Sequence, residues 1–292
     1  MVKYFYISGK SMKEVIHMKQ FHKQLLGFGV AAAAVPLFML APGRASRSRK
    51  LPFFGRNFAH RGLHTADRSI PENSMEAFRL AAENGYGVEL DVRLSKDGQV
   101  VVFHDDTLER VCGIPGRVDD FDYEDLRHMK LYGSSWGIPL FSEVLDVLGG
   151  RVPIICELKT GPRNHELCSK TCDLISSYRG DVCIESFDPR IVAWFRLHAK
   201  HLIRGQLATL PSRYPDDVTG GKIFAFLAGN TLLNFLGRPQ FIAYEVGSQP
   251  FSVRLAQFLG AMKVGWTSHD AKNEQNKDVV IFEYYRPLQV YK

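Results

Sequence analysis

Two acidic residues lie in one short apolar stretch, Val88-Glu89-Leu90-Asp91-Val92. Side chains two positions apart on a β-strand point to the same face, so Glu89 and Asp91 should project together. Two carboxylates on one buried face repel each other unless a positive charge compensates them. Because oxygen ligands suit Mg²⁺ or Ca²⁺, the pair indicates a site for one divalent cation. An exposed edge strand carrying two solvated acids is the alternative interpretation.

A histidine, His104, ends the next apolar stretch along the chain. The Asp97-Gly98 pair before this stretch is typical of a tight hairpin turn. Depending on where the turn is centred, His104 lies opposite Glu89 or opposite Asp91. Both registers place an imidazole beside the acidic pair, where it could transfer protons.

Three other strand ends carry residues suited to phosphate chemistry. His60 and Arg61 together offer a proton-transfer group and a planar donor fork that matches a phosphate. Glu157 and Lys159 share a strand face and would add a third carboxylate and an ammonium, although a cross-strand ion pair could use the same residues. Trp266 could stack on a glycerol-like group, or it could be an ordinary core or surface tryptophan.

Elements that could position these residues alternate along the chain from residue 57 onward. The predicted strands are 57–60, 88–93, 100–104, 152–159, 181–187, 201–207, 241–245, 263–267 and 278–283, and the predicted helices are 74–84, 141–148, 165–178, 189–200 and 251–259. Such alternation favours βαβ units and a largely parallel sheet. We therefore predict an α/β fold, a TIM-type (β/α)8 barrel with its chemistry at the carboxyl ends of the strands. A doubly wound open sheet is the alternative.

Two irregular regions interrupt this alternation. Residues 111–140 are rich in glycine and proline, which predicts a small loop-rich insertion. Residues 209–240 are unusually apolar for a loop. They should either pack on the barrel or face a membrane or a lipid substrate.

Composition narrows the choice of partner. The chain has 292 residues, of which 45% are hydrophobic, and a net charge of +6. These values are ordinary for a globular protein. The body has no stripe of lysine and arginine interleaved with aromatic residues, so we expect no nucleic-acid partner.

The N-terminal region contains 17 uncharged residues from Leu25 to Ala41. This length is at the short end of what spans a bilayer. Without a clear cleavage site, the segment favours an uncleaved single-pass membrane anchor over a cleaved signal peptide or a buried core helix. The basic cluster that follows it, and five cysteines without the spacing of a disulfide framework, predict a catalytic domain facing the cytosol. We therefore predict a basic segment over residues 1–50, with an anchor at about 25–41, and a barrel domain over residues 55–287.

The motifs occur in an order that resembles the bacterial-type glycerophosphodiester phosphodiesterase family. The matching segments are HRG at 60–62, PENS at 71–74, ELDV at 89–92, SKDG at 95–98, VVFHD at 101–105, IPLFSEVL at 138–145 and ELK at 157–159. Each motif alone is weakly specific, but the ordered set is strong and covers about residues 57 to 285.

The resemblance implies a TIM-type barrel with one divalent cation, Mg²⁺ or Ca²⁺. It also implies hydrolysis of a glycerophosphodiester to sn-glycerol 3-phosphate and an alcohol. Three groups of site residues follow from it: the acid/base pair His60 and His104, the metal ligands Glu89, Asp91 and Glu157, and the substrate-binding residues Arg61, Lys159 and Trp266.

The chain departs from the family pattern near its end, and two other functions stay open. The family usually has WTVN where this chain has WTSH at 266–269, and the usual IITD becomes IFE at 281–283. The first alternative function is a lysophospholipase D acting on membrane lysophospholipids, which the predicted anchor and the apolar residues 209–240 motivate. The second is a non-enzymatic, membrane-attached binding barrel, which predicts that catalytic residues are missing.

Overall fold

The computed structural model describes residue 17 and residues 34–215 and 220–292. The chain divides into two compact units, Met1–Met39 and Leu40–Lys292. In the first unit, described residues 34–39 are helical. The second unit contains the candidate site and all the strands that the described residues form. The predicted division into residues 1–50 and 55–287 stays a prediction.

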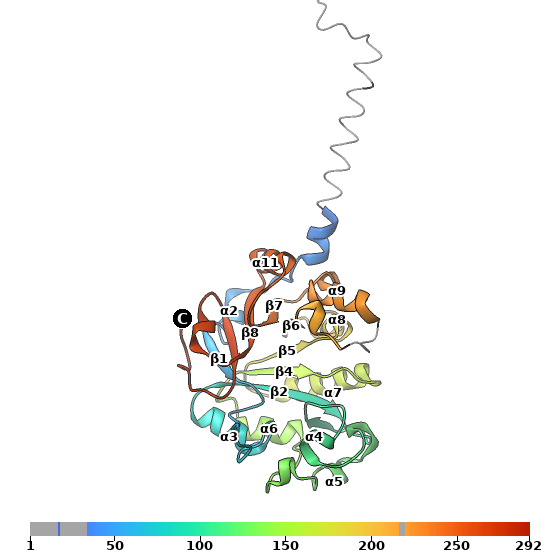
Figure 1. The fold of residues 1–292 in the computed structure, drawn as a ribbon, viewed down its shortest axis with the longest axis vertical. Coiled ribbons are helices and arrows are strands. Elements are labelled where there is room, and N and C mark those ends of the chain that lie inside the picture. The colour runs from blue at the N-terminus through green and yellow to red at the C-terminus, as the bar shows by residue number, and fades with distance from the viewer. Residues whose placement is uncertain (1–16, 18–33, 216–219) are drawn as a thin grey trace, which may run out of the picture. The chain divides into compact units, whose positions relative to one another are not determined.

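Eight parallel strands form a closed barrel in the second unit (Figure 1). The strands are β1 (Arg56–Ala59), β2 (Gly87–Leu94), β4 (Ile154–Leu158), β5 (Val182–Ser186), β6 (Ile203–Ala208), β7 (Phe241–Glu245), β8 (Met262–Ser268) and β9 (Val279–Phe282). Strand β1 closes the barrel because it pairs with both β2 and β9. The prediction of a TIM-type barrel is confirmed, and the open sheet is excluded.

The main helices alternate with the strands and lie outside the barrel (Figure 1). They are α3 (Met75–Glu83), α6 (Phe141–Leu148), α7 (Asn164–Ser177), α8 (Pro189–His198) and α11 (Phe251–Phe258). Local sequence explains where two of them begin. The Ser74 hydroxyl accepts a hydrogen bond from the Ala77 N–H at 3.2 Å, and the Asp188 carboxylate caps α8, whose first residue is Pro189.

Further helices occupy the two irregular regions. They are α4 (Glu109–Cys112) and α5 (Tyr123–Leu126) in the first, and α9 (Gly221–Gly229) and α10 (Asn234–Gly237) in the second; α2 (Arg47–Lys50) precedes the barrel. Helix α9 buries Ala225 and Ala228 but leaves Ile223 75% exposed and Phe226 56% exposed. The apolar residues of 209–240 that belong to α9 therefore pack into the core on one side of the helix only.

Apolar side chains form two layers, one inside the barrel and one between the strands and the helices. Val88, Leu90 and Val92 of β2 belong to the core under the helices. Ile155 of β4 belongs to the core inside the barrel, together with Phe58. Glu89 and Asp91 alternate with the first set and so project into the barrel, as the strand periodicity predicts.

The hairpin after β2 forms, but its register differs from both expected ones. Strand β3 (Val100–Val102) runs antiparallel to β2 and pairs Val92 with Val102. The Phe103 N–H then donates to the Asp91 carbonyl at 3.0 Å, so Phe103, and not His104, lies opposite Asp91. The Ser95 N–H donates to the Gln99 carbonyl at 3.0 Å, so the turn is one residue longer than a two-residue hairpin turn.

The predicted membrane anchor at about 25–41 is corrected by the structure. Across residues 34–215 and 220–292, no helix is both long enough and apolar enough to span a bilayer. Residues 25–33 lie outside the described residues. Leu40, near the end of the segment, is 3% exposed and packs in a core cluster with Ile242 and Tyr244. The prediction of a single-pass membrane location, with a cytosolic catalytic domain, was wrong. The apolar side chain of Leu40 packs in the core instead.

Candidate active site

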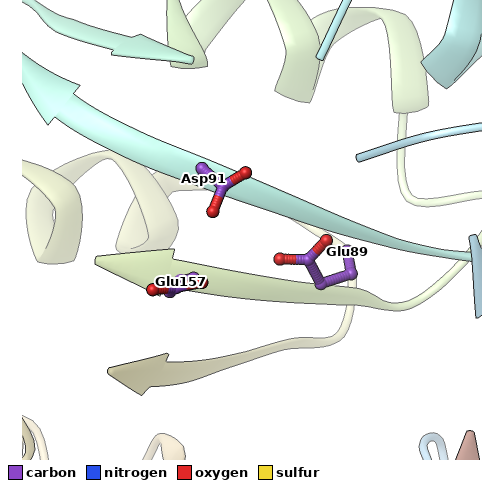
Figure 2. Close-up of side chains that lie close together, drawn as sticks. All are labelled: Glu89, Asp91 and Glu157. Atoms are coloured by element: carbon purple, nitrogen blue, oxygen red, sulfur yellow. The ribbon is translucent and has the colours of Figure 1, made fainter. Parts of the chain in front are cut away.

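Three carboxylates meet inside the carboxyl end of the barrel (Figure 2). Glu89 and Asp91 come from β2 and Glu157 comes from β4, and the strand pairing sets Asp91 directly beside Glu157. One oxygen from each carboxylate lies within 4.8 Å of the others. All three residues are buried, with exposures of 2%, 0% and 7%. The predicted pair and the third acid therefore form one cluster.

The electrostatics of this cluster indicate repulsion between its carboxylates. Burial, followed by repulsion from Asp91 and Glu157, raises the pKa of Glu89 well above its usual value. Burial also raises the pKa of Glu157 to about 6. Asp91 differs: burial opposes its ionisation, but the charges of Lys159 and Arg61 hold its pKa well below the usual value. A divalent cation between the three oxygens would relieve this repulsion.

Arg61 follows β1 in a tight turn that holds it against the acids. Its backbone has φ 52°, and its N–H donates to Glu89 Oε2 at 2.9 Å. The guanidinium donates to Glu72 Oε1 at 2.9 Å and lies 3.4 Å from Asp91 Oδ2. Gly62 completes the turn at φ 78°. The Arg61 side chain is thus positioned beside the acid cluster from two directions.

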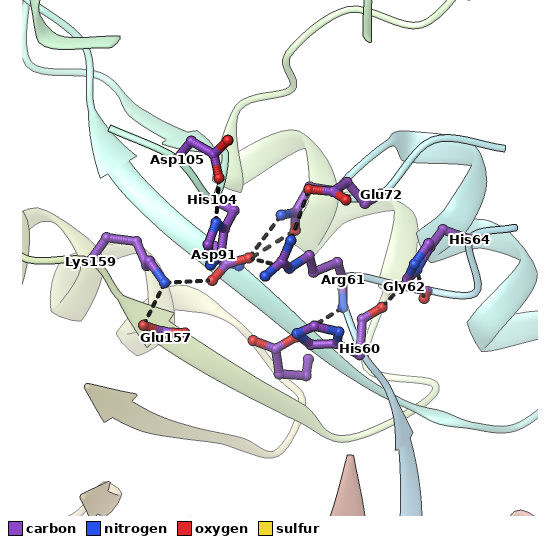
Figure 3. A network of polar contacts seen from close by, with 12 residues as sticks. His60, Arg61, Gly62, His64, Glu72, Asp91, His104, Asp105, Glu157 and Lys159 are labelled. Atoms are coloured by element: carbon purple, nitrogen blue, oxygen red, sulfur yellow. Dashed lines mark hydrogen bonds and ion pairs between the residues drawn. The ribbon is translucent and has the colours of Figure 1, made fainter. Parts of the chain in front are cut away.

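Two further donors contact Asp91 and Glu157, and one of them, Lys159, is seen in Figure 3. Lys159 donates to Glu157 Oε1 at 2.7 Å and lies 3.4 Å from Asp91 Oδ1. The Asn73 amide donates to Asp91 Oδ2 at 2.9 Å. Asn73 belongs to the PENS motif, so one residue of that motif supports Asp91.

The two histidines lie beside this cluster (Figure 3), and each contacts a carboxylate through Nδ1. His60 Nδ1 is 2.9 Å from Glu283 Oε2, and His104 Nδ1 is 2.5 Å from Asp105 Oδ1. An ionised carboxylate only accepts hydrogen bonds, so Nδ1 carries the hydrogen in both rings. Neutral imidazoles of this tautomer have their lone pair on Nε2. His60 Nε2 is 4.0 Å from Glu89 Oε2, and so faces the acid cluster.

Both imidazoles are disposed toward the neutral form. Burial, followed by the charge of Arg61, lowers the pKa of His60. Burial, followed by the charge of Lys159, lowers the pKa of His104 to about 4. Either histidine is therefore available to accept a proton near neutral pH.

A chain of ion pairs outside the cluster joins His104 to Arg61. Arg110 contacts both oxygens of Asp105, at 2.5 and 2.9 Å, and donates to Glu72 Oε1 at 2.6 Å. Glu72 in turn accepts from Arg61. Glu72 thus has a defined place as the link between the two arginines.

Trp266 lies at the other side of the opening, in the wall of a cavity of about 870 Å³. Its ring packs edge-on against Phe187 with centroids 5.5 Å apart, and its Nε1 donates to the Ala243 carbonyl at 3.1 Å. His104 and Lys159 line the same cavity. Of the eight predicted site residues, His104, Lys159 and Trp266 thus line this cavity, and the other five belong to the acid cluster and its contacts, which are His60, Arg61, Glu89, Asp91 and Glu157.

Sequence reasoning missed three polar residues of this end of the barrel. Glu283 follows β9 and His269 follows β8, and both were noted only as departures from a family pattern. Glu185 of β5 pairs with Glu157, is 1% exposed, and has a pKa raised by burial. The strand-end rule that singled out Glu157 would also have found Glu185 and Glu283.

Comparisons with known proteins agree with this geometry. The chain matches the model of the "Glycerophosphoryl diester phosphodiesterase family" over residues 60–281. A glycerophosphodiester phosphodiesterase of Caldanaerobacter subterraneus subsp. tengcongensis is 37% identical over 35% of this chain and 44% of its own length. A rat protein named lysophospholipase D GDPD1 is 32% identical over 49% of this chain and 48% of its own length. The chain thus matches about half of these relatives or less.

A solved structure also shares the fold. It is an Oleispira antarctica phosphodiesterase in complex with its product sn-glycerol-3-phosphate. The likeness has a TM-score of 0.63 with 20% identity, and covers 78% of this chain and 93% of that one. This likeness concerns the barrel fold alone.

Proposed function

Because the chain belongs to the glycerophosphoryl diester phosphodiesterase family, we propose that it hydrolyses glycerophosphodiesters with the help of a divalent cation. The products are sn-glycerol 3-phosphate and an alcohol. One observation carries the proposal: a buried three-carboxylate cluster has an arginine, a lysine and two histidines directly around it. Opposite charges and proton-transfer groups at this spacing suit attack on an anionic phosphodiester.

Glu89, Asp91 and Glu157 would hold the cation, with Mg²⁺ and Ca²⁺ both compatible with an all-oxygen ligand set. The fit rests on the burial, followed by the repulsion, that raises the pKa of Glu89, because a cation would offset both effects. When bound, the ion would supply positive charge next to the phosphoryl oxygens.

Arg61 and Lys159 would bind the phosphate group. The contacts of Arg61 with Glu72 and Asp91 hold the guanidinium in one orientation, so little side-chain freedom is lost when substrate binds. Lys159 adds a second positive charge on the opposite side of Asp91. Together they would stabilise the negative charge that builds up on the phosphoryl oxygens in the transition state.

His60 and His104 would move the protons. The Nδ1 contacts with Glu283 and Asp105 leave Nε2 of each ring for substrate. One Nε2 takes the proton from the attacking oxygen, and the other imidazole, once protonated, gives a proton to the leaving alcohol. The attacking oxygen is that of water or of the glycerol 2-hydroxyl.

The test measures metal-dependent release of glycerol 3-phosphate from glycerophosphocholine by the full chain. We expect His60→Ala and Glu89→Ala to lower kcat at least about a hundredfold, the scale of a lost proton-transfer group or metal ligand. Glu124→Gln is the matched control, since the Glu124 side chain is 73% exposed. Full activity in both site variants would contradict the assignment.

A second substrate class is favoured by the cavity beside Trp266. Apolar side chains line it, among them Phe187, Phe224, Leu233 and Leu236, and it reaches His104 and Lys159. A cavity of about 870 Å³ with such walls could take an acyl chain while the phosphate lies at the acids. We therefore propose lysophospholipids as alternative substrates, in line with the name of the rat relative.

Turnover of lysophosphatidylcholine and of glycerophosphocholine separates the two substrate classes. If the cavity binds an acyl chain, Phe224→Ala and Leu233→Ala should raise KM for the lysolipid several-fold and leave the soluble diester unaffected. Leu197→Ala, at a 66% exposed position, serves as the control. Equal effects on both substrates would argue against acyl-chain binding.

A further inference from the structure

A single carboxylate, that of Glu283, collects three histidines at the end of β9. Its Oε2 lies 2.9 Å from His60 Nδ1, and its Oε1 lies 2.9 Å from His269 Nε2. His64 Nε2 approaches the same Oε2 at 3.6 Å. Each carboxylate oxygen therefore has its own close imidazole partner, and the group cannot rotate without breaking a contact.

The backbone around Glu283 holds these contacts in place. The Glu283 N–H donates to the Ser268 carbonyl at 3.0 Å, and the His60 N–H donates to the Phe282 carbonyl at 2.9 Å. The ends of β8, β9 and β1 are thus joined to one another at this point. His60 and Glu283 are separated by 223 residues in the chain, so only barrel closure brings them together.

His269, Glu283 and His60 form a row, and the exposed fraction of the side chain is larger for the outer residue, His269, than for the other two. The His269 side chain is 58% exposed, whereas those of Glu283 and His60 are each 15% exposed. Tyr284 supports the row from the side: its ring stacks on His269 at 5.9 Å and meets His64 edge-on at 5.1 Å. An exposed histidine thus contacts the carboxylate that contacts a histidine facing the acid cluster.

We propose that Glu283, oriented by His269, is a positioning residue that keeps His60 in the Nδ1–H tautomer with Nε2 turned toward the reacting phosphate. Glu283 accepts the Nδ1–H hydrogen bond through Oε2, and His269 prevents the carboxylate from turning by bonding Oε1. His64 Nδ1–H donates to the His60 carbonyl at 3.0 Å and so supports the backbone of His60. This inference rests on the proposed function, in which His60 moves a proton.

His104 has an arrangement similar to that of His60, with a carboxylate of its own. Asp105 contacts His104 Nδ1 and is held by Arg110, just as Glu283 contacts His60 Nδ1 and is held by His269. A carboxylate at Nδ1 selects the tautomer and the ring angle of an imidazole. Each proton-transfer group thus has its own carboxylate and its own second contact to fix that carboxylate.

The experiment compares Glu283→Gln, His269→Ala and His269→Asn with the wild-type chain. Glu283→Gln should lower kcat by about a hundredfold or more, because the amide can donate to Nδ1 and favour the wrong tautomer. His269→Ala should lower kcat about three- to tenfold, and His269→Asn, which keeps a donor, should recover most of that loss. KM should stay within about twofold in all three, since none of these side chains is proposed to bind substrate. His128→Ala, at a 71% exposed position, is the control for loss of a surface histidine.

Nitrogen-15 NMR of the imidazoles supplies a readout that does not depend on turnover. We expect His60 to show the Nδ1–H tautomer in the wild type and to lose it in Glu283→Gln. If the wild type has no phosphodiesterase activity but shows this change, the proposed function fails and the positioning role stands. An unchanged tautomer, or a kcat within threefold of wild type in Glu283→Gln, would overturn the positioning role. If Glu283→Gln does not fold, the same two measurements on His269→Ala decide the question.

Discussion

Side chains along β2 point alternately into the barrel, where the acids lie, and outward into the apolar core under the helices. Glu89 and Asp91 point into the barrel, whereas Val88, Leu90 and Val92 pack under the helices. The period of two that separates these faces is a local property of an extended chain. The acid pair could therefore be predicted from five consecutive letters of the sequence.

The roles of His60 and Arg61 required more than local pattern. A histidine or an arginine at the end of a strand does not by itself indicate catalysis. The chemistry of these two residues was therefore predicted from the order of the family motifs. The contacts that support those roles come from distant residues: Glu283 for His60, and Glu72 and Asp91 for Arg61. Sequence spacing does not encode such contacts.

A pH dependence of stability follows from Glu283. Burial opposes ionisation of this residue, but the hydrogen bond from His60, with further help from His269, lowers its pKa to about 2. A depressed pKa means that the ionised group stabilises the fold above pH ~4.5 and that this contribution is lost as pH falls toward 2. We expect Glu283→Gln to lower the free energy of unfolding by on the order of 2 kcal/mol at neutral pH, after discounting for solvent screening.

Urea unfolding of both proteins between pH 7 and pH 3 tests this expectation. The gap between wild type and Glu283→Gln should narrow as the solution becomes more acidic. A gap of constant size across this range would show that the carboxylate charge is not what stabilises the fold.

Single elements deliver the site residues, and small backbone features decide where they arrive. The β2–β3 hairpin brings His104 to the acid cluster even though its register is shifted by one residue from either expected pairing. The reason is that His104 lies beyond the paired part of β3, where the chain leaves the strand and turns toward Asp105 and Arg110. The element was predictable, but its end was not.

The turn after β1 offers a test at the scale of an element. A Cβ at Gly62, which has φ 78°, would lie 2.8 Å from the backbone carbon of Ala77 in α3. Gly113 has φ 68°, but a Cβ there would meet nothing within 4 Å. Gly62→Ala should therefore cost backbone strain plus a clash, roughly 2–4 kcal/mol, whereas Gly113→Ala should cost only the strain, about 1 kcal/mol.

Thermal unfolding of the two alanine variants measures the difference, and phosphodiesterase activity measures its effect on the site. Gly62→Ala should also lose activity, because Arg61 and His60 precede this turn directly. If the two variants are equally stable, the close approach of the turn to α3 does not limit the packing.

At the scale of the whole molecule, the acid cluster opposes folding unless its charge is compensated. Three buried carboxylates within 4.8 Å are brought together only in the folded state, so a cation bound there stabilises that state over the unfolded chain. We expect Mg²⁺ or Ca²⁺ at about a hundred times its dissociation constant to add about 2.7 kcal/mol to the free energy of unfolding.

Differential scanning fluorimetry with added cation and with EDTA tests this coupling. The melting temperature should rise with the cation and fall back with the chelator. Glu157→Gln should remove most of the response, while Glu166→Gln, at a 39% exposed side chain, should keep it. A response of the same size in Glu157→Gln would place the cation elsewhere.

The sequence by itself determined the alternation of strands and helices, the inward face of Glu89 and Asp91, and the family motifs in their order. Those features depend on residues close together in the chain. Tertiary structure alone decided the partners of His60, the cavity beside Trp266, and the place of Leu40 in the core. Barrel closure through β1, β2 and β9 joins residues more than 200 positions apart, and no local period or spacing encodes that closure.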